Sequence, residues 1–302
     1  MSANKFSLSS RGGKIFLLLI IIVAFVANVA FYYNKINAKK SSSAPLRLVE
    51  QNIPASTTTE SKTEHKPSLQ NNNKTSDYNL PVLMYHYIRQ IDLGDPDSGQ
   101  LSVSPVNFDQ QMKALVSAGY STISPDELAQ LLENDQPVPN KKFMLTFDDG
   151  YADFYPNAYP VLQKYNLRAI VFVITDKIGT NGYLNWQEIK EMRASGHVII
   201  GGHTKTHVDL TYCEPDQIDR EIIISKAALE KELREPITVF AYPAGHYDSY
   251  VLATAKKAGY QFAFTTEFGS DQQEAHPYTL KRVRIGNEYF PEGMVSFLES
   301  LK

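Results

Sequence analysis

Two adjacent carboxylates follow a hydrophobic run near the middle of the chain. Asp148 and Asp149 lie in the stretch TFDDGY, directly after KKFML. In a regular strand neighbouring side chains point to opposite faces, so both carboxylates can enter one pocket only where the chain leaves the strand, as Gly150 allows. A glycosidase pair is disfavoured, because its carboxyl groups lie roughly 5–10 Å apart across a sugar. A turn or a helix cap formed by either aspartate is the structural alternative.

Two histidines four residues apart offer a second kind of ligand. His203 and His207 flank TKT and follow Gly201-Gly202. The glycines and the β-branched threonines disfavour a helix and predict a loop or a single turn. Two neutral imidazoles, one carboxylate and an open position make a catalytic site of the zinc type, and Asp149 can supply the carboxylate. Surface histidines without a ligand are the alternative.

The elements that must position these groups are short strands alternating with helices. Seven apolar runs rich in β-branched or aromatic residues predict buried strands, and six amphipathic segments between them predict helices. The strand segments are PVLMYH, KKFMLTFDD, RAIVFVI, HVIIGGH, ITVFAYP, QFAFTT and LKRVRI. Such alternation favours a parallel sheet, and seven strands fit a small or distorted (β/α) barrel better than an open sheet. The polar groups YH, DDG, GGHTKTH and YPAGHY would then meet at its carboxyl edge.

Composition excludes some classes of function. The 302 residues carry a net charge of -3, with 30 basic and 33 acidic residues, and contain no Lys/Arg block interleaved with aromatics. Nucleic acid is therefore not an expected partner. Cys213 is the only cysteine, which excludes an internal disulfide and a thiolate zinc cluster. Histidine and carboxylate remain as the expected metal ligands.

The amino-terminal part of the chain predicts an anchor and a tether. Residues 15–33, IFLLLIIIVAFVANVAFYY, carry no charge and, at about 1.5 Å per residue, can cross a hydrocarbon core of about 30 Å. A cleaved signal peptide is the alternative, although its apolar region is usually about 7–15 residues long. Residues 34–79 are polar and predict a flexible linker. We expect a cytoplasmic segment (1–14), a single transmembrane anchor in a bacterial cytoplasmic membrane, this linker, and an extracytoplasmic folded domain (80–302).

The predicted domain resembles the polysaccharide deacetylase family, also called the NodB-homology or carbohydrate esterase family 4 fold. TFDDG is similar to the family's first motif, and HTKTH is similar to its second, H-[ST]-x-x-H. The resemblance implies a distorted (β/α)7 barrel in which Asp149, His203 and His207 hold one divalent ion, with Asp148 as general base. Zn²⁺ is the expected ion, with Co²⁺ and Ni²⁺ as alternatives. PVLMYH, the segment from VSPVNF to YSTIS, and FAYPAGHYD resemble the branch of the biofilm poly-N-acetylglucosamine deacetylases.

The third motif departs from the family pattern. AYPAG stands where the family has R-x-P-[YFW], so Ala241 replaces an arginine that orients the base. Arg282 or Arg284, in KRVRIG, is the candidate source of the missing guanidinium. The resemblance also implies that the backbone N–H of Ala244 donates to the developing oxyanion, a role that needs no particular side chain.

The fourth and fifth motifs are less complete. LNWQEI echoes the fourth, with Trp186 as a wall of the acetyl pocket and Asn185 in place of an acid. The fifth, [LI]-x-H, is absent near the end of the chain, so the general acid must come from elsewhere. His86 is the first candidate, followed by His246 and His276, whereas His197 is expected to be structural. The expected substrate contacts are Tyr242, Pro243, Trp186 and Arg282.

These features predict a metal-dependent hydrolase at the cell surface. Its expected substrate is a β-linked N-acetylglucosamine polymer, either the biofilm polymer or peptidoglycan, from which it removes N-acetyl groups. An esterase acting on O-acetyl groups of xylan or peptidoglycan is one alternative. A carbohydrate-binding homologue without turnover is another, suggested by the incomplete third and fifth motifs.

Overall fold

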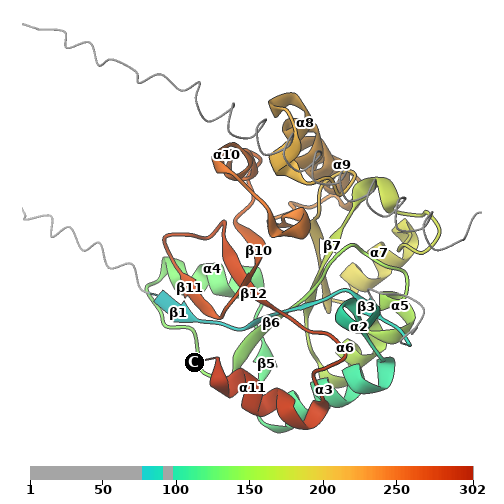
Figure 1. Cartoon of the computed structure of the whole chain (residues 1–302), viewed down its shortest axis with the longest axis vertical. Helices are drawn as coiled ribbons and strands as arrows, with labels where there is room; N and C mark the ends of the chain where they lie inside the picture. The colour runs from blue at the N-terminus through green and yellow to red at the C-terminus, as the bar shows by residue number, and fades with distance from the viewer. Residues whose placement is uncertain (1–76, 91–97, 302) are drawn as a thin grey trace, which may run out of the picture. The chain divides into compact units, whose positions relative to one another are not determined.

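Seven parallel strands close into a barrel in the computed structural model, which describes residues 77–90 and 98–301 (Figure 1). Their order around the barrel is β2-β12-β10-β9-β8-β7-β6, and pairing of β6 with β2 closes the ring. The strands are β2 (Val82–Tyr85), β6 (Lys142–Phe147), β7 (Ala169–Val173), β8 (Val198–Gly202), β9 (Val239–Ala241), β10 (Phe262–Phe268) and β12 (Leu280–Arg284). Six of them lie within predicted apolar runs, and β10 extends two residues past the predicted run QFAFTT. The predicted (β/α)7 barrel is therefore confirmed.

Three shorter pairings add to this frame. β5 (Ser121–Thr122) runs parallel to the start of β6, and β3 (Tyr87–Ile88) runs parallel to β4 (Ser102–Val103). The antiparallel pair β1 (Asp77–Asn79) and β11 (Asp271–Gln273) lies outside the barrel sheet. β1 therefore lies within the predicted linker, and its first residue is three residues before the predicted boundary at residue 80.

Helices connect the strands. They are α2 (Ser98–Leu101), α3 (Pro105–Ser117), α4 (Pro125–Glu133), α5 (Phe154–Asn157), α6 (Tyr159–Tyr165), α7 (Trp186–Ala194), α8 (Pro215–Asp219), α9 (Ser225–Leu233), α10 (Ser249–Lys257) and α11 (Met294–Ser300). The six predicted helical segments all contain helix. α11, which lies beside α3 at the bottom of Figure 1, was not expected from the sequence.

Local sequence signals account for where helices begin. α3 and α4 both open with a Ser-Pro pair, whose serine caps the helix while the proline takes the first helical position. At α4 the cap is reciprocal: the Ser124 side chain accepts from the Glu127 N–H, and the Glu127 carboxylate accepts from the Ser124 N–H at 2.8 Å.

Alternation along each strand divides the core into two layers. On β6, Phe143, Leu145 and Phe147 belong to the layer that packs beneath the helices, whereas Met144 belongs to the smaller cluster inside the barrel. The inner cluster also contains Phe172, and a Cβ added to Gly201 would lie 2.5 Å from that ring. By the same alternation, the side chains that follow Met144 at every second position face the barrel interior.

The predicted anchor at residues 15–33 and nearly all of the predicted linker lie outside the described residues. Among the helices that the structure describes, none combines the length and the apolar composition that a membrane crossing requires.

Candidate metal centre and its paired aspartate

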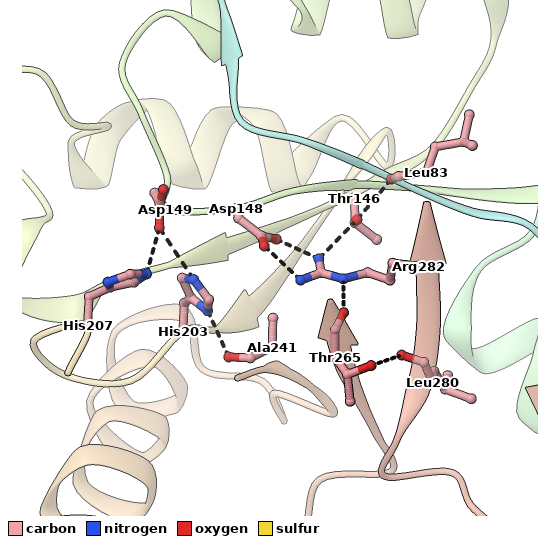
Figure 2. Close-up of polar contacts among 10 residues, drawn as sticks. All are labelled: Leu83, Thr146, Asp148, Asp149, His203, His207, Ala241, Thr265, Leu280 and Arg282. Atoms are coloured by element: carbon pink, nitrogen blue, oxygen red, sulfur yellow. Dashed lines mark hydrogen bonds and ion pairs between the residues drawn. The ribbon is translucent and has the colours of Figure 1, made fainter. Parts of the chain in front are cut away.

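The two carboxylates of TFDDG turn to different partners at the carboxyl end of β6 (Figure 2). Asp148 continues the alternation of the strand, and its side chain enters the barrel. Asp149 has φ 73 and Gly150 has φ 74, so two consecutive left-handed residues turn the chain out of the strand. This turn points the Asp149 carboxylate away from that of Asp148 and toward the two histidines.

Asp149, His203 and His207 form the one group of described residues that could hold a metal ion. Asp149 Oδ1 lies 3.3 Å from His203 Nε2 and 3.2 Å from His207 Nε2, and the three ligand atoms all lie within 4.8 Å of one another. His203 Nδ1 lies 2.7 Å from the carbonyl oxygen of Ala241. Because that oxygen can only accept, Nδ1 carries the hydrogen and Nε2 of the neutral ring faces the carboxylate with a lone pair. The geometry predicted for these three residues is therefore present.

The charges in this cluster favour a cation among the three side chains. Burial opposes ionisation of Asp149, but the neighbouring histidines outweigh it and hold the pKa of its carboxyl well below the ordinary value. Burial also opposes protonation of His203, yet Asp149 and Asp148 raise the pKa of that ring above its ordinary value. For His207, burial and then the neighbouring His203 lower the pKa. Asp149 thus stays ionised and requires positive charge from its partners.

Asp148 is bound by a guanidinium inside the barrel. Arg282 Nη1 donates to Asp148 Oδ1 and Nη2 donates to Oδ2, both at 2.7 Å. The arginine is fully buried, and its Nε donates to the carbonyl oxygen of Thr265 at 2.8 Å. Nη1 also donates to Thr146 Oγ1, which in turn donates to a carbonyl of β2 (Figure 2). Every part of this charged pair therefore has a hydrogen-bond partner.

Arg282 determines the ionisation of its partner. Burial alone raises the pKa of Asp148, but the charge of Arg282, followed by that of His203, outweighs it and brings the pKa below the ordinary value. Asp148 is therefore ionised near neutral pH although it is 4% exposed.

The missing guanidinium of the AYPAG motif comes from β12. Of the two predicted candidates, Arg282 is buried on Asp148, whereas Arg284 is exposed at the end of the strand. Ala241, in the position of the expected arginine, contributes its carbonyl to His203 instead. Arg282 was also an expected substrate contact. With no exposed surface, it contacts Asp148 and the barrel wall rather than solvent.

Of the other residues in AYPAG, Tyr242 and Pro243 are buried in the core, and Ala244 is exposed. Tyr242 is fully buried, and its hydroxyl donates to the carbonyl of Tyr278 at 3.1 Å. Pro243 is buried as well. These two expected substrate contacts therefore lie beneath the surface, because Tyr242 packs into the aromatic core beside Phe240. Ala244 is exposed after β9 with φ 54, and its carbonyl accepts from Thr266 Oγ1 at 3.0 Å.

The LNWQEI segment is tied to the turn that carries Asp149. The N–H of Leu184 donates to the carbonyl of Gly150 at 2.9 Å, two residues before Trp186. Trp186 is half-buried against the outer core. Asn185 caps α7 by accepting from two backbone N–H groups, so its side chain is already engaged.

The candidate proton donors separate by their place on the barrel. His86 follows β2 at the carboxyl end, where burial lowers the pKa of its ring and the Asp148 and Asp149 carboxylates act in the opposite direction. His246 is largely exposed and pairs with Asp209 at 2.7 Å. His276 and His197 precede β12 and β8, at the opposite end. Nδ1 of His197 lies 2.8 Å from the carbonyl oxygen of Leu167, which is consistent with the structural role expected for this histidine.

Two side chains that support this site were not expected from the sequence. Thr146 lies inside the predicted strand and carries no signal beyond alternation. Glu221 lies in a predicted amphipathic helix and contacts the loop between the two histidines, 15 residues away. Only the folded structure brings it there.

Comparisons with known proteins agree with this geometry. A family model described as polysaccharide deacetylase matches residues 135–263. The protein YxkH of Bacillus subtilis, whose name places it among polysaccharide deacetylases, is 35% identical over 223 residues, covering 74% of this chain and 77% of YxkH. The chain belongs to the polysaccharide deacetylase family. It is accordingly a hydrolase of amide carbon–nitrogen bonds.

Two further relatives are informative. The structure of the Streptococcus pyogenes deacetylase PplD in complex with acetate superposes with a TM-score of 0.69 at 33% identity, covering 75% of this chain and 100% of that one. A poly-β-1,6-N-acetyl-D-glucosamine N-deacetylase of Staphylococcus aureus is 27% identical over 202 residues, covering 63% of this chain and 69% of the relative.

Replacing Arg282 by glutamine should shift the acid limb of the deacetylase pH–rate profile to higher pH. Without the guanidinium, burial raises the pKa of Asp148, so this carboxylate is protonated, and unable to accept a proton, at pH values where the wild type is active. Breaking the buried pair should also lower the free energy of unfolding by about 3–5 kcal/mol. Acetate release measured as a function of pH reports the shift of the acid limb. Equilibrium unfolding in urea reports the loss of stability.

The exposed Arg284→Gln variant is the matched control on the same strand, and its acid limb should coincide with that of the wild type. An unmoved acid limb in a folded R282Q protein would contradict the role given to Arg282.

Proposed function

We propose that this family member is a divalent-metal-dependent N-deacetylase of a β-linked N-acetylglucosamine polymer. One observation carries the proposal. Three potential ligand atoms lie within 4.8 Å of one another, and Asp148, the neighbour of Asp149, is buried and bound by Arg282. A site for a cation and a fixed proton acceptor are the two parts that metal-assisted hydrolysis requires.

The residues present fit a divalent ion. Two imidazoles and one carboxylate are the donor set of catalytic zinc sites. Asp149 Oδ1 is buried without a hydrogen-bond partner, which leaves it available as a ligand. Its separations of 3.2 and 3.3 Å from the histidine nitrogens are near the roughly 3.4 Å between ligands about 2.1 Å from a tetrahedral ion. Zn²⁺ is the expected ion, with Co²⁺ and Ni²⁺ as alternatives.

The chemistry divides among the residues at the carboxyl end of the barrel. A divalent ion bound there would polarise the acetamide carbonyl and lower the pKa of water. Asp148 accepts the proton of the attacking water, and Arg282 keeps that carboxylate ionised and oriented. His86 donates a proton to the leaving amine, and the backbone N–H of Ala244 donates to the developing oxyanion.

The choice of polymer rests on the relatives. The Staphylococcus aureus relative is named for deacetylation of poly-β-1,6-N-acetyl-D-glucosamine, which makes the biofilm polymer the first candidate and peptidoglycan the second. Loss of acetyl groups would leave amines and make either polymer cationic. The alternative of a carbohydrate-binding homologue without turnover was suggested by two departures from the family motifs. For the first, the missing motif-three arginine, Arg282 supplies a guanidinium that binds Asp148.

The purified full-length chain should release acetate from N-acetylglucosamine oligomers, and a chelator should abolish the release. Zn²⁺ or Co²⁺ should restore it, because Asp149, His203 and His207 are the expected ligands. Acetate assays with N-acetylated and O-acetylated oligomers in parallel distinguish the deacetylase from the esterase. Shortened chains without acetate would indicate a glycosidase, and no release with any metal would indicate a binding protein.

Replacing His86 by alanine should lower kcat about 10²–10⁴-fold and remove the alkaline limb of its pH dependence, because the leaving amine loses its proton donor. His246→Ala is the matched control at the same end of the barrel. It should keep the wild-type kcat and the alkaline limb of the pH dependence. Steady-state kinetics over pH, with thermal unfolding to monitor folding, make the comparison. A folded H86A enzyme with wild-type kcat would assign the acid elsewhere.

We also propose that residues 15–33 anchor the catalytic domain outside a bacterial cytoplasmic membrane, as their uncharged composition suggests. Deleting residues 1–40 should move the protein from the membrane fraction to the supernatant of lysed cells while acetate release persists. Immunoblots of the two fractions measure the shift, and an unchanged distribution would contradict the anchor.

A further inference from the structure

The loop that carries the second histidine has an unusual backbone. Between His203 and His207 the chain passes through Thr204 with φ 62, and His207 itself has φ 66. Left-handed conformations of residues other than glycine cost on the order of 1 kcal/mol or more each, and β-branched threonine adopts them rarely. The loop therefore needs partners elsewhere in the fold to hold it.

The carbonyl groups of the loop are held from one side. They accept from the 3₁₀ turn η1 (Thr175–Lys177), which follows β7. The N–H of Thr175 donates to the carbonyl of Thr204 at 3.2 Å, and the N–H of Asp176 donates to the carbonyl of Lys205 at 3.0 Å. Within the loop, the N–H of His207 donates to Thr204 Oγ1 at 2.9 Å.

The amide groups of the loop are held from the other side by one carboxylate. Glu221 Oε2 accepts from the N–H of Lys205 at 2.9 Å and from the N–H of Thr206 at 2.8 Å. Its Oε1 accepts from the Thr206 hydroxyl at 2.7 Å. Glu221 is 4% exposed, and a buried carboxylate is tolerated only where such bonds replace water.

A local distortion of the helix presents this carboxylate. Glu221 lies in a π-helical turn, Arg220–Ile224, inserted between α8 and α9. The buried Ser225 supports the turn, because its hydroxyl donates to the carbonyl of Glu221 at 2.6 Å and to that of Ile222 at 3.1 Å. π-turns inside α-helices occur frequently at functional sites.

We infer that Glu221 is a positioning residue that sets the affinity of the Asp149–His203–His207 site for a divalent ion. It acts through His207 and touches neither substrate nor ion. Of the two histidines, His203 is buried and anchored at the end of β8, whereas the His207 side chain is 39% exposed and depends on the loop. Without the carboxylate, two amide groups lose their acceptor and the left-handed turn loses its support. This role depends on the metal site proposed above.

The test is Zn²⁺ affinity of the metal-stripped full-length chain, measured in competition with a chromophoric chelator. Glu221→Gln should bind Zn²⁺ about 10- to 100-fold more weakly, the usual effect of losing a group that orients a ligand. Only one side of the neutral amide can accept, so either the two N–H groups or the Thr206 hydroxyl lose their acceptor. Hydrogen exchange of the metal-free protein, followed by mass spectrometry on peptides covering residues 204–207, should be faster in this variant. This second readout requires neither metal nor activity.

Glu230→Gln is the matched control. Glu230 lies on α9, where its Oε1 accepts from the N–H of Ile237 at 3.0 Å and pairs with Lys226, so this variant weakens comparable contacts of a carboxylate away from the loop. It should keep wild-type Zn²⁺ affinity and wild-type exchange at residues 204–207. Thr206→Val removes only the hydroxyl contact and should weaken Zn²⁺ binding several-fold, about the value of one hydrogen bond.

The outcomes separate the two proposals. If the wild type binds Zn²⁺ and the folded Glu221→Gln protein binds it equally well, the positioning role is overturned while the proposed function stands. If the wild type binds no divalent ion, the proposed function fails and the role of Glu221 fails with it. Should Glu221→Gln unfold, Thr206→Val decides: unchanged affinity and exchange in that variant overturn the inference.

Discussion

A buried guanidinium bound to both oxygens of a buried carboxylate is the interaction on which this site depends. Asp148 directly follows β6 and Arg282 lies on β12, with β2 between the two strands in the barrel. Without its partner, a carboxylate inside the barrel would bind a proton. Such a pair adds little net stability, because desolvation of the two charges offsets their attraction. Its value here is a proton acceptor with a fixed charge and a fixed direction.

Two neighbouring carboxylates can both remain ionised because each has its own source of positive charge. Asp148 faces a permanent cation of the protein, inside the barrel. Asp149 faces His203 and His207 at the rim, where an exchangeable cation can bind. The left-handed conformation of Asp149 and Gly150 separates the two. A regular strand continuation at these residues would have placed Asp149 toward the helices, on the face of Phe147.

The sequence alone predicted much of the fold, because seven strands buried on both faces read as short apolar runs and most helices begin at recognisable caps. It also predicted that Asp149, His203 and His207 lie together, since strand ends of a parallel barrel share one edge. The choice between Arg282 and Arg284 was not predictable from pattern, because residues two apart face the same side. The two arginines differ in depth, because Arg282 lies in the middle of β12 and is buried, whereas Arg284 ends the strand and is exposed to solvent. Tyr242 was misplaced for a related reason, since an aromatic residue after a strand can turn either to the rim or to the core.

Features that depend on distant contacts lie beyond such patterns. The helical segment that contains Glu221 reads as an ordinary amphipathic helix, and no residue type marks the π-turn in it. The turn matters because the ligands differ in rigidity. Asp149 and His203 follow directly from strands and are buried, whereas His207 is carried by a loop. A metal site is only as well formed as its least constrained ligand, so the position of His207 in the candidate site depends on the groups that hold this loop.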